Sequence, residues 1–126
     1  QTMAEEKSMR EERSKVRGNL VIDDAVDFWG AVNGNMKVVA GGKVYMRGAV
    51  YGNLAVEAGG RVHVFGHVTG DLLVLAGAKV IHSGTVGGDA VNRGGRLYVE
   101  AGAAVMGKVK TRDGETRIHS KAKVNR

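Results

Sequence analysis

The sequence predicts an all-β protein, a three-sided β-solenoid of about 18 residues per coil and five to six coils. Two periodicities predict it: an aliphatic residue recurs at every sixth position, and glycines recur at every eighteenth. Composition agrees, because glycine supplies 20 of the 126 residues, more than twice its average share of about 7%. Since 43% of the residues are hydrophobic, the chain can form a core rather than stay disordered.

The six-residue period runs through twelve consecutive positions without a miss. Residues six apart fall on opposed faces of a helix but on one face of a strand, so the period predicts extended chain. The aliphatic positions are Leu20, Val26, Val32, Val38, Val44, Val50, Val56, Val62, Val68, Val74, Val80 and Val86. We expect the nine valines from Val38 onward to form a core ladder, each stacked on its equivalent in the neighbouring coil.

The glycines divide each coil into three sides of different composition. The motif Gly-x-Val-x-Gly, which marks the third side, is centred on Val32, Val50, Val68 and Val86. The first side begins with Met36 and Val38, and the second side begins with Val44 and Met46. Inward residues therefore stack like on like, at the spacing of about 4.8 Å that separates paired strands.

Beyond the twelfth position the register changes. Asn92 stands where the next valine is due, and the pattern resumes one residue early at Gly95. A last, incomplete turn is expected around Asp113–Gly114. The residues expected at the two ends of the solenoid, where a further copy would stack, are Leu20, Ile22, Leu97, Val99, Val105, Val109 and Ile118.

Charge and composition set the two termini apart from the repeat. Residues 1–17 carry five basic and four acidic side chains among strong helix formers, which predicts a short charged helix or tail. Residues 18–119 form the expected solenoid domain, and residues 120–126 form a basic tail. A helix lying over the first coil would cover its open strand edge.

No cluster of reactive side chains emerges from this lattice. His63 and His67 point outward on different sides and His82 points inward, so these histidines do not converge as metal ligands must. Asp71 and Asp89 follow corner glycines and are interpreted as turn residues rather than an acid–base pair. No glycine cluster is followed by the Lys-Ser/Thr of a phosphate-binding loop. We therefore expect no catalytic, cofactor-binding or metal-binding residues.

Four basic side chains align outward on the second side. This basic ridge consists of Lys43, Arg61, Lys79 and Arg96. Like charges one coil apart repel, so the ridge predicts an anionic partner. Together with the basic tail it predicts weak, salt-sensitive contact with anionic lipid or nucleic acid. A solvated ridge without a ligand is the alternative interpretation.

Two segments carry a further motif, in which V-x-G-x-V-x-G alternates with G-D-aliphatic and ends in G-A-x-V-x-G. They are Gly66-His-Val-Thr-Gly-Asp-Leu-Leu-Val-Leu-Ala-Gly-Ala-Lys-Val and Leu97-Tyr-Val-Glu-Ala-Gly-Ala-Ala-Val-Met-Gly-Lys-Val. Over about residues 18–110 the chain resembles the bactofilins, bacterial polymer-forming cytoskeletal proteins. The resemblance implies a right-handed, three-sided β-helix that assembles end to end, without nucleotide, into filaments that scaffold cell shape or localise other proteins.

The expected function is that of a structural scaffold without enzymatic activity. A solenoid ends in uncovered coils, whose unpaired backbone groups and apolar cross-section favour stacking on a second copy. Two alternatives stay open. One is a β-helical binding module that forms a closed dimer with other cytoskeletal or division proteins, as the septum-site division inhibitor does. The other is a trimeric, left-handed hexapeptide-repeat enzyme.

The expected partners are further copies of the chain, with cytoskeletal or cell-envelope proteins as additional candidates. No apolar run approaches the roughly 18 residues of a membrane-spanning helix, and the N-terminus begins with charged residues. We therefore expect a cytoplasmic protein, with peripheral contact at the inner membrane face as a further option.

Overall fold

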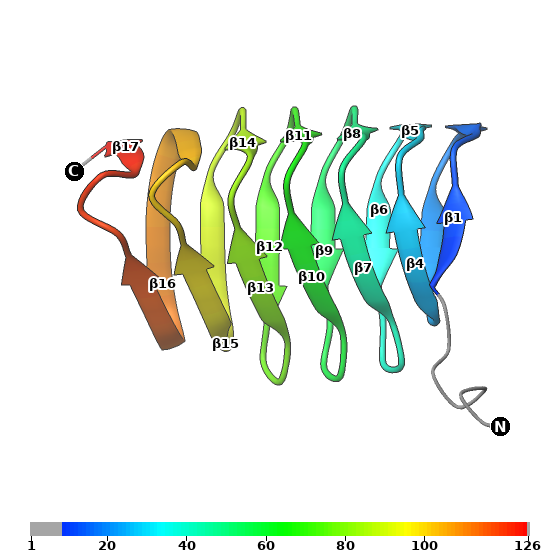
Figure 1. Ribbon diagram of the computed structural model, residues 1–126. Coiled ribbons are helices and arrows are strands. Elements are labelled where there is room, and N and C mark those ends of the chain that lie inside the picture. Colours follow the sequence, from blue (N-terminus) through cyan, green and yellow to red (C-terminus); the bar gives the residue numbers. More distant parts are fainter. Residues whose placement is uncertain (1–8, 126) are drawn as a thin grey trace, which may run out of the picture.

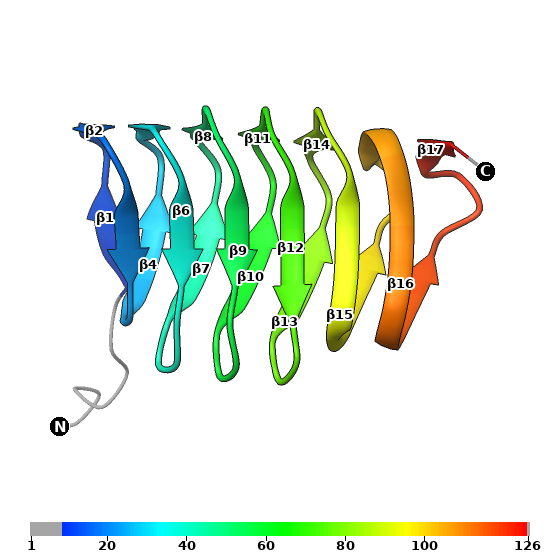
Figure 2. The same ribbon diagram turned by 180° about the vertical axis from the view of Figure 1, so that it is seen from behind.

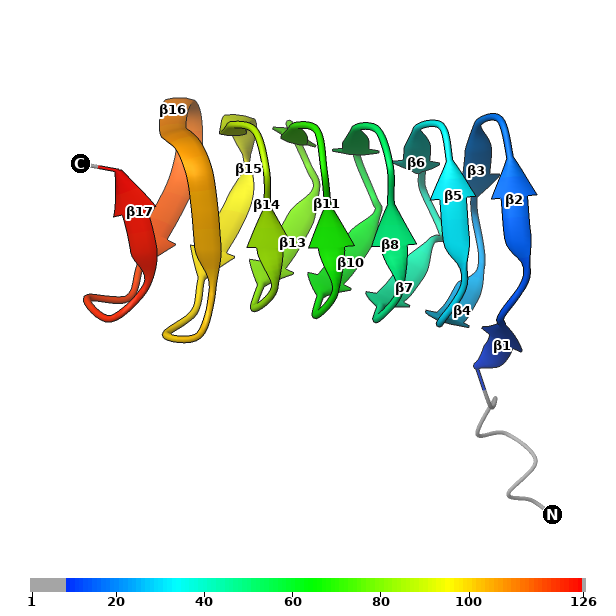
Figure 3. The ribbon, with the colours of Figure 1, turned by 90° about the horizontal axis from the view of Figure 1, so that it is seen from above.

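The computed structural model describes residues 9–125, which form one all-β coil without a helix. The chain winds around a single axis into about six coils (Figure 1). Every strand pairs in parallel with its equivalent in a neighbouring coil. The prediction of a three-sided β-solenoid is confirmed, and its sides are seen from the front, the back and above in Figures 1, 2 and 3.

Each side is a stack of short strands. The second side contains β1 (Arg10–Glu12), β4 (Ala25–Phe28), β7 (Lys43–Met46), β10 (Arg61–Val64) and β13 (Lys79–His82). The third side contains β2 (Lys15–Arg17), β5 (Ala31–Asn33), β8 (Ala49–Val50), β11 (His67–Val68), β14 (Thr85–Val86) and β17 (Lys123–Asn125). The first side contains β3 (Leu20–Ile22), β6 (Met36–Val38), β9 (Leu54–Val56) and β12 (Leu72–Leu75). Two long strands, β15 (Ala90–Val99) and β16 (Ala104–Ile118), bend around corners and serve more than one side.

The coil is right-handed. In Figure 1 the second side faces the viewer with its strands pointing upward, while successive coils advance from right to left. Seen from above in Figure 3, the third-side strands then run from the front to the back. The chain thus turns clockwise as it recedes. The left-handed helix on which the enzyme alternative depended is therefore wrong for this chain.

The spacing between equivalent residues is 18 through the middle of the molecule, as in the pairs Val44–Val62 and Val62–Val80. It is 16 between the first and second coils, where Arg10 pairs with Val26. It becomes 17 from Val80 to Leu97. The one-residue deletion predicted before Gly95 is therefore present.

The core is a continuous column of side chains along the axis. The nine ladder valines are each at most 3% exposed. On the first side Met36, Leu54 and Leu72 stack in register and are fully buried. Because strands alternate inward and outward residues, each coil contributes these inward positions and leaves the intervening ones outside.

Two corners of the coil have distinct structural requirements. Gly48 passes so close to Gly30 that an added Cβ would collide with that residue's carbonyl oxygen, so this corner requires glycine. At another corner the Oδ1 of each Asn or Asp accepts the backbone N–H of the next coil. The chain of acceptors runs through Asn19, Asn35, Asn53, Asp71 and Asp89. The interpretation of Asp71 and Asp89 as turn residues agrees with these bonds.

Asn92 occupies an inward position opposite Val74 and is fully buried. Its Oδ1 accepts the N–H groups of Gly94 and Gly95, at 3.1 and 2.9 Å. Its Nδ2 lies 2.9 Å from the carbonyl oxygen of Glu115. A polar residue replaces the valine here because the shortened turn leaves backbone groups inside the coil that need partners.

The domain boundaries differ from those expected. Residues 9–17 form strands β1 and β2 rather than a helix, so the solenoid begins at Arg10 instead of residue 18. Residues 1–8 lie outside the described part of the chain. At the other end, β17 pairs with β16, so residues 123–125 continue the coil rather than form a separate tail. Pairing with an open sheet edge outweighs local helix propensity, because a short isolated helix is only marginally stable.

Candidate functional site

The two ends of the solenoid differ in the side chains that occupy the inward positions of their last coils. At the N-terminal end, Arg10 pairs with Val26 and Glu12 pairs with Phe28, both of which are core residues. Arg10 and Glu12 therefore occupy inward positions of the first coil. Because these residues are charged, this end of the core column is suited to contact with water rather than with a further apolar layer.

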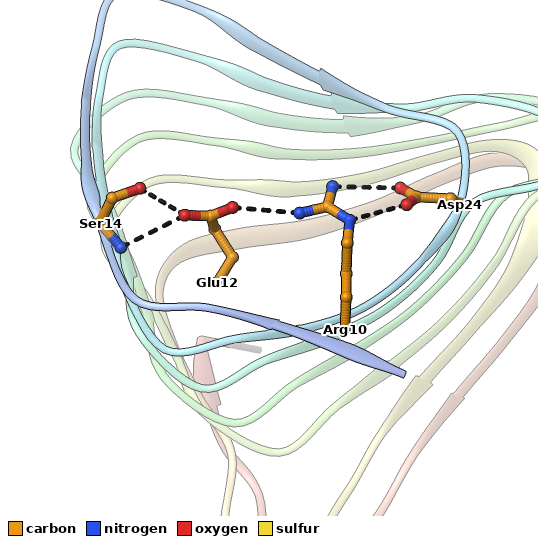
Figure 4. A network of polar contacts seen from close by, with 4 residues as sticks. All are labelled: Arg10, Glu12, Ser14 and Asp24. Atoms are coloured by element: carbon orange, nitrogen blue, oxygen red, sulfur yellow. Dashed lines mark hydrogen bonds and ion pairs between the residues drawn. The ribbon is translucent and has the colours of Figure 1, made fainter. Parts of the chain in front are cut away.

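These two residues belong to a network that crosses the first coil (Figure 4). Arg10 donates two hydrogen bonds to Asp24, at 2.7 and 3.2 Å, and one to Glu12 at 3.0 Å. Glu12 in turn accepts hydrogen bonds from the hydroxyl and the N–H of Ser14. We call Arg10, Glu12, Ser14 and Asp24 the N-terminal ionic layer.

The layer is ionised at neutral pH. The hydrogen bond from Arg10 lowers the pKa of the Asp24 carboxyl below its ordinary value. The hydrogen bonds from Ser14 likewise lower the pKa of Glu12. Hydrogen bonding to Asp24 raises the pKa of Arg10, so all three charges persist. A coil stacked directly on this layer would have to remove water from them.

Among residues 9–125, the C-terminal end presents no charge at the corresponding positions. By their register, the inward residues of the last turn are Val109, Thr111, Thr116, Ile118 and Val124. The three apolar members are only partly buried, because among residues 9–125 no further coil covers them. The hydroxyl of Thr111 donates a hydrogen bond of 2.7 Å to the hydroxyl of Thr116. These five residues form the C-terminal end face.

The residues expected at the ends are divided by the structure into three groups. On β3 in the first coil Leu20 is only partly buried, whereas Ile22 is 2% exposed and belongs to the core; Val109 and Ile118 lie in the C-terminal end face. By contrast, Leu97, Val99 and Val105 are interior residues, at most 2% exposed. Their assignment to an end is wrong, because the last turn of β16 and β17 covers them.

Sequence reasoning missed the N-terminal ionic layer and the role of Val124. A signal for the first coil was present: Val16 is the inward residue of Lys15–Val16–Arg17 and pairs with Val32. The spacing from Val16 to Val32 is 16 rather than 18, so the periodic search passed over it.

The basic ridge lies on the second side as expected, with Lys43, Arg61, Lys79 and Arg96 in register on consecutive strands. Within residues 9–125 none of the four makes an ion pair. Most of the ridge borders two shallow hollows, of about 180 and 440 Å³. The ridge therefore presents four unneutralised cations to solvent.

Beside the ridge, at the corner where the second side ends, arginines alternate with aromatic rings. The Arg13 guanidinium lies 5.1 Å from the centre of the Trp29 ring, and Arg47 lies 5.2 Å from that ring. Arg47 is also 4.7 Å from the Phe65 ring and pairs with Asp27 at 2.7 Å. We call Arg13, Trp29, Arg47 and Phe65 the arginine–aromatic ladder. Cation–π contacts of this kind stabilise a surface by about 0.5–1 kcal/mol each.

The histidines are dispersed. His82 is fully buried, with its Nε2 3.0 Å from the Ala104 carbonyl oxygen and its Nδ1 without a hydrogen-bond partner. Burial lowers the pKa of His82. It also lowers the pKa of His63, which is less deeply buried. The Nε2 of His63 lies 2.9 Å from the hydroxyl of Ser83. Over residues 9–125 no group of three His, Cys, Asp or Glu side chains is placed to hold a metal ion.

Within the described chain, no helix has the length and hydropathy needed to cross a membrane. No protein-family model, curated protein or solved structure matches the sequence.

Proposed function

We propose that this protein is a structural scaffold unit, without enzymatic activity, that assembles by stacking its end coils on those of further copies. The observation that carries the proposal is the C-terminal end face, with its partly buried apolar residues Val109, Ile118 and Val124. Such a surface gains stability when a second copy covers it, by about 25 cal/mol per Å² of apolar area buried.

Backbone pairing supports the same proposal. Within residues 9–125, strands β1, β2 and β3 pair on one side only, with β4, β5 and β6. At the opposite end the last turn of β16 likewise pairs only with the coil before it. Unpaired strand edges are templates for association with another chain. Stacking continues the fold and needs no nucleotide or metal.

An open filament joins unlike ends, and it is the assembly implied by the resemblance to the bactofilins. On this proposal the protein is a cytoskeletal scaffold in the bacterial cytoplasm or at the inner face of the membrane. Its partners are its own copies, together with the cytoskeletal or cell-envelope proteins that the filament localises.

A closed dimer is the second candidate, and the N-terminal ionic layer favours it. In a filament the apolar C-terminal end face would meet Arg10 and Glu12, whose charges would lose water without gaining new partners. In a dimer related by a two-fold axis, two C-terminal end faces meet and both ionic layers stay in solvent. This candidate corresponds to a β-helical binding module.

The test combines negative-stain electron microscopy with light scattering of the full chain in the absence of nucleotide and metal. Ile118→Asp places a charge in the C-terminal end face, where the residue is only partly buried, so the coil folds but association is lost. Thr69→Asp adds the same charge at an exposed position in the middle of the solenoid and serves as the control.

Filaments that Ile118→Asp abolishes and Thr69→Asp preserves would support the scaffold. Dimers with the same response would support the closed assembly. A chain that stays monomeric at concentrations of about 0.1 mM, where even weak homodimers are populated, would contradict both candidates.

A further inference from the structure

We propose that the second side binds single-stranded nucleic acid along the solenoid axis, with phosphates on the basic ridge and bases beside the neighbouring rings. This inference is independent of how the chain assembles, because it uses a lateral surface rather than an end. It concerns four cations that repeat in register and make no ion pair within residues 9–125.

The ridge differs from several basic side chains of the first three coils. Arg10, Arg13 and Arg47 each pair with a carboxylate, at 2.7 to 3.4 Å. Lys37 pairs with Glu57 at 3.6 Å. The ridge cations have no such partner within residues 9–125, although they repeat in register on four consecutive strands. Their mutual repulsion is relieved by a ligand that carries regularly spaced negative charge.

Each ridge cation has an outward neighbour two residues along the same strand. These neighbours are Tyr45, His63, Ile81 and Tyr98, so three of the four are rings. The ammonium of Lys43 is 5.8 Å from the centre of the Tyr45 ring, and that of Lys79 is 6.0 Å from the Tyr98 ring. The side therefore repeats a cation once per coil, accompanied by a ring in three of the four coils.

Two acidic side chains near these rings are already engaged. Asp27 pairs with Arg47 at 2.7 Å, and Glu115 pairs with Arg117 at 2.6 Å. Glu100, whose charge acts on His63, makes no ion pair within residues 9–125. A hollow of about 440 Å³ is lined by Arg61, Lys79 and Arg96 together with the glycines of the adjoining corners.

This arrangement favours a single strand over other polyanions. Proteins that bind single strands without sequence preference combine a positive track with rings on which bases stack. Four cations one coil apart span about 14 Å, the length of about four nucleotide steps at the 3.4 Å per strand of stacked B-form DNA. Linear polyphosphate would use the cations but not the rings. A duplex would present its bases only at groove edges.

The experiment measures binding of a fluorescent oligothymidylate of about twenty nucleotides to the full chain, by anisotropy over a range of salt concentrations. Four phosphate contacts on a single strand predict a slope of log K against log salt of about −2.8. A fourfold rise in salt should then weaken binding about 50-fold.

Two variants with equal charge loss locate the site. The ridge variant changes Lys43, Arg61, Lys79 and Arg96 to Gln, and the control variant changes Lys108, Lys110, Lys121 and Lys123 to Gln. The ridge variant should lose binding and the salt slope, whereas the control should keep both. The opposite result, or no binding by the unchanged chain at low salt, would overturn the proposal. Circular dichroism verifies that both variants are folded.

A second pair of variants tests the rings. Tyr98→Leu should weaken binding about 5- to 150-fold, the effect of losing one stacked base, without changing the salt slope. Tyr51→Leu removes a 56% exposed ring from another side and should have no effect. Equal affinity for polyphosphate of the same charge, or for anionic vesicles, would refute nucleic acid as the ligand. None of these outcomes depends on filament or dimer formation, because the ridge and the end faces are separate surfaces.

Discussion

The N-terminal ionic layer is expected to weaken stacking on the first coil, and replacing it should strengthen association at that end. The double variant Arg10→Val, Glu12→Phe copies the residues found at the equivalent positions of the second coil, Val26 and Phe28. Both replacements would be partly exposed in a single chain and covered by a stacked copy. The N-terminal end would then resemble the C-terminal end face.

The magnitude follows from the burial of two side chains. Full burial of a Val or Phe contributes about 1.5–3 kcal/mol. The host coil leaves about half of the side chain exposed at position 10 and about a third at position 12, since the side chain of Arg10 is 50% exposed and that of Glu12 33%. Stacking should therefore gain about 1.2–2.5 kcal/mol, which tightens self-association roughly 8- to 70-fold. The stability of a single chain should change by no more than about 1 kcal/mol, because the lost ion pairs are exposed.

Analytical ultracentrifugation over a concentration series measures this change, and urea unfolding measures the stability. The matched control is Arg10→Gln, Glu12→Gln, which removes the charges without adding apolar surface and should strengthen association less than the Val/Phe variant does. If the Val/Phe variant is folded and associates no more tightly than the original chain, the ionic layer does not control the N-terminal end.

Three further predictions concern the core. Burial lowers the pKa of His82, so on acidification the unfolded chain takes up a proton before the folded chain does. The contribution of His82 to the free energy of unfolding is complete above about pH 6.5. Below that pH it declines, until the pKa of the folded state is reached, by at most about 1.4 kcal/mol per pH unit. His82→Val should flatten that decline in urea unfolding series, and an unchanged slope would contradict it. Asn92→Ala should cost about 3 kcal/mol or more in thermal unfolding, because the N–H groups of Gly94 and Gly95 lose their acceptor; a loss below about 1 kcal/mol would mean that water replaces the side chain. Val105→Asp should unfold the last coils rather than merely prevent assembly, because Val105 is 2% exposed, and a native circular dichroism spectrum for this variant would refute the placement.

The middle of the solenoid was predictable because its information is local and repeated. Every coil from Ala25 to Val86 has the same number of residues on each side. The positions of Val44, Val62 and Val80 in the chain therefore already determine how they stack. The ridge was predictable for the same reason, since Lys43 and Arg61 are 18 residues apart on matching strands. Side chains that repeat with the coil inherit its geometry.

The ends were less predictable because the spacing changes there. Residues 10–17 have high helix propensity and few apolar side chains, yet they form strands along the exposed edge of β4 and β5. Val105 was assigned to an end because the pattern appeared to be finishing, whereas β17 supplies one more layer through Val124. The periodic pattern consists of apolar side chains. The coil, however, also continues wherever backbone N–H and C=O groups find hydrogen-bond partners.

The sequence by itself determined the fold class, the three sides, the residues of the core ladder and the alignment of the basic ridge, because each follows from a period that the chain repeats. Only the tertiary structure decided the right-handed winding, the extent of the solenoid and the contrast between its ends. The contrast depends on which residues lie opposite Val26 and Phe28, and on the reach of Arg10 across the first coil to Asp24. Such pairings join positions whose spacing departs from the repeat, so they exist only once the coil has closed.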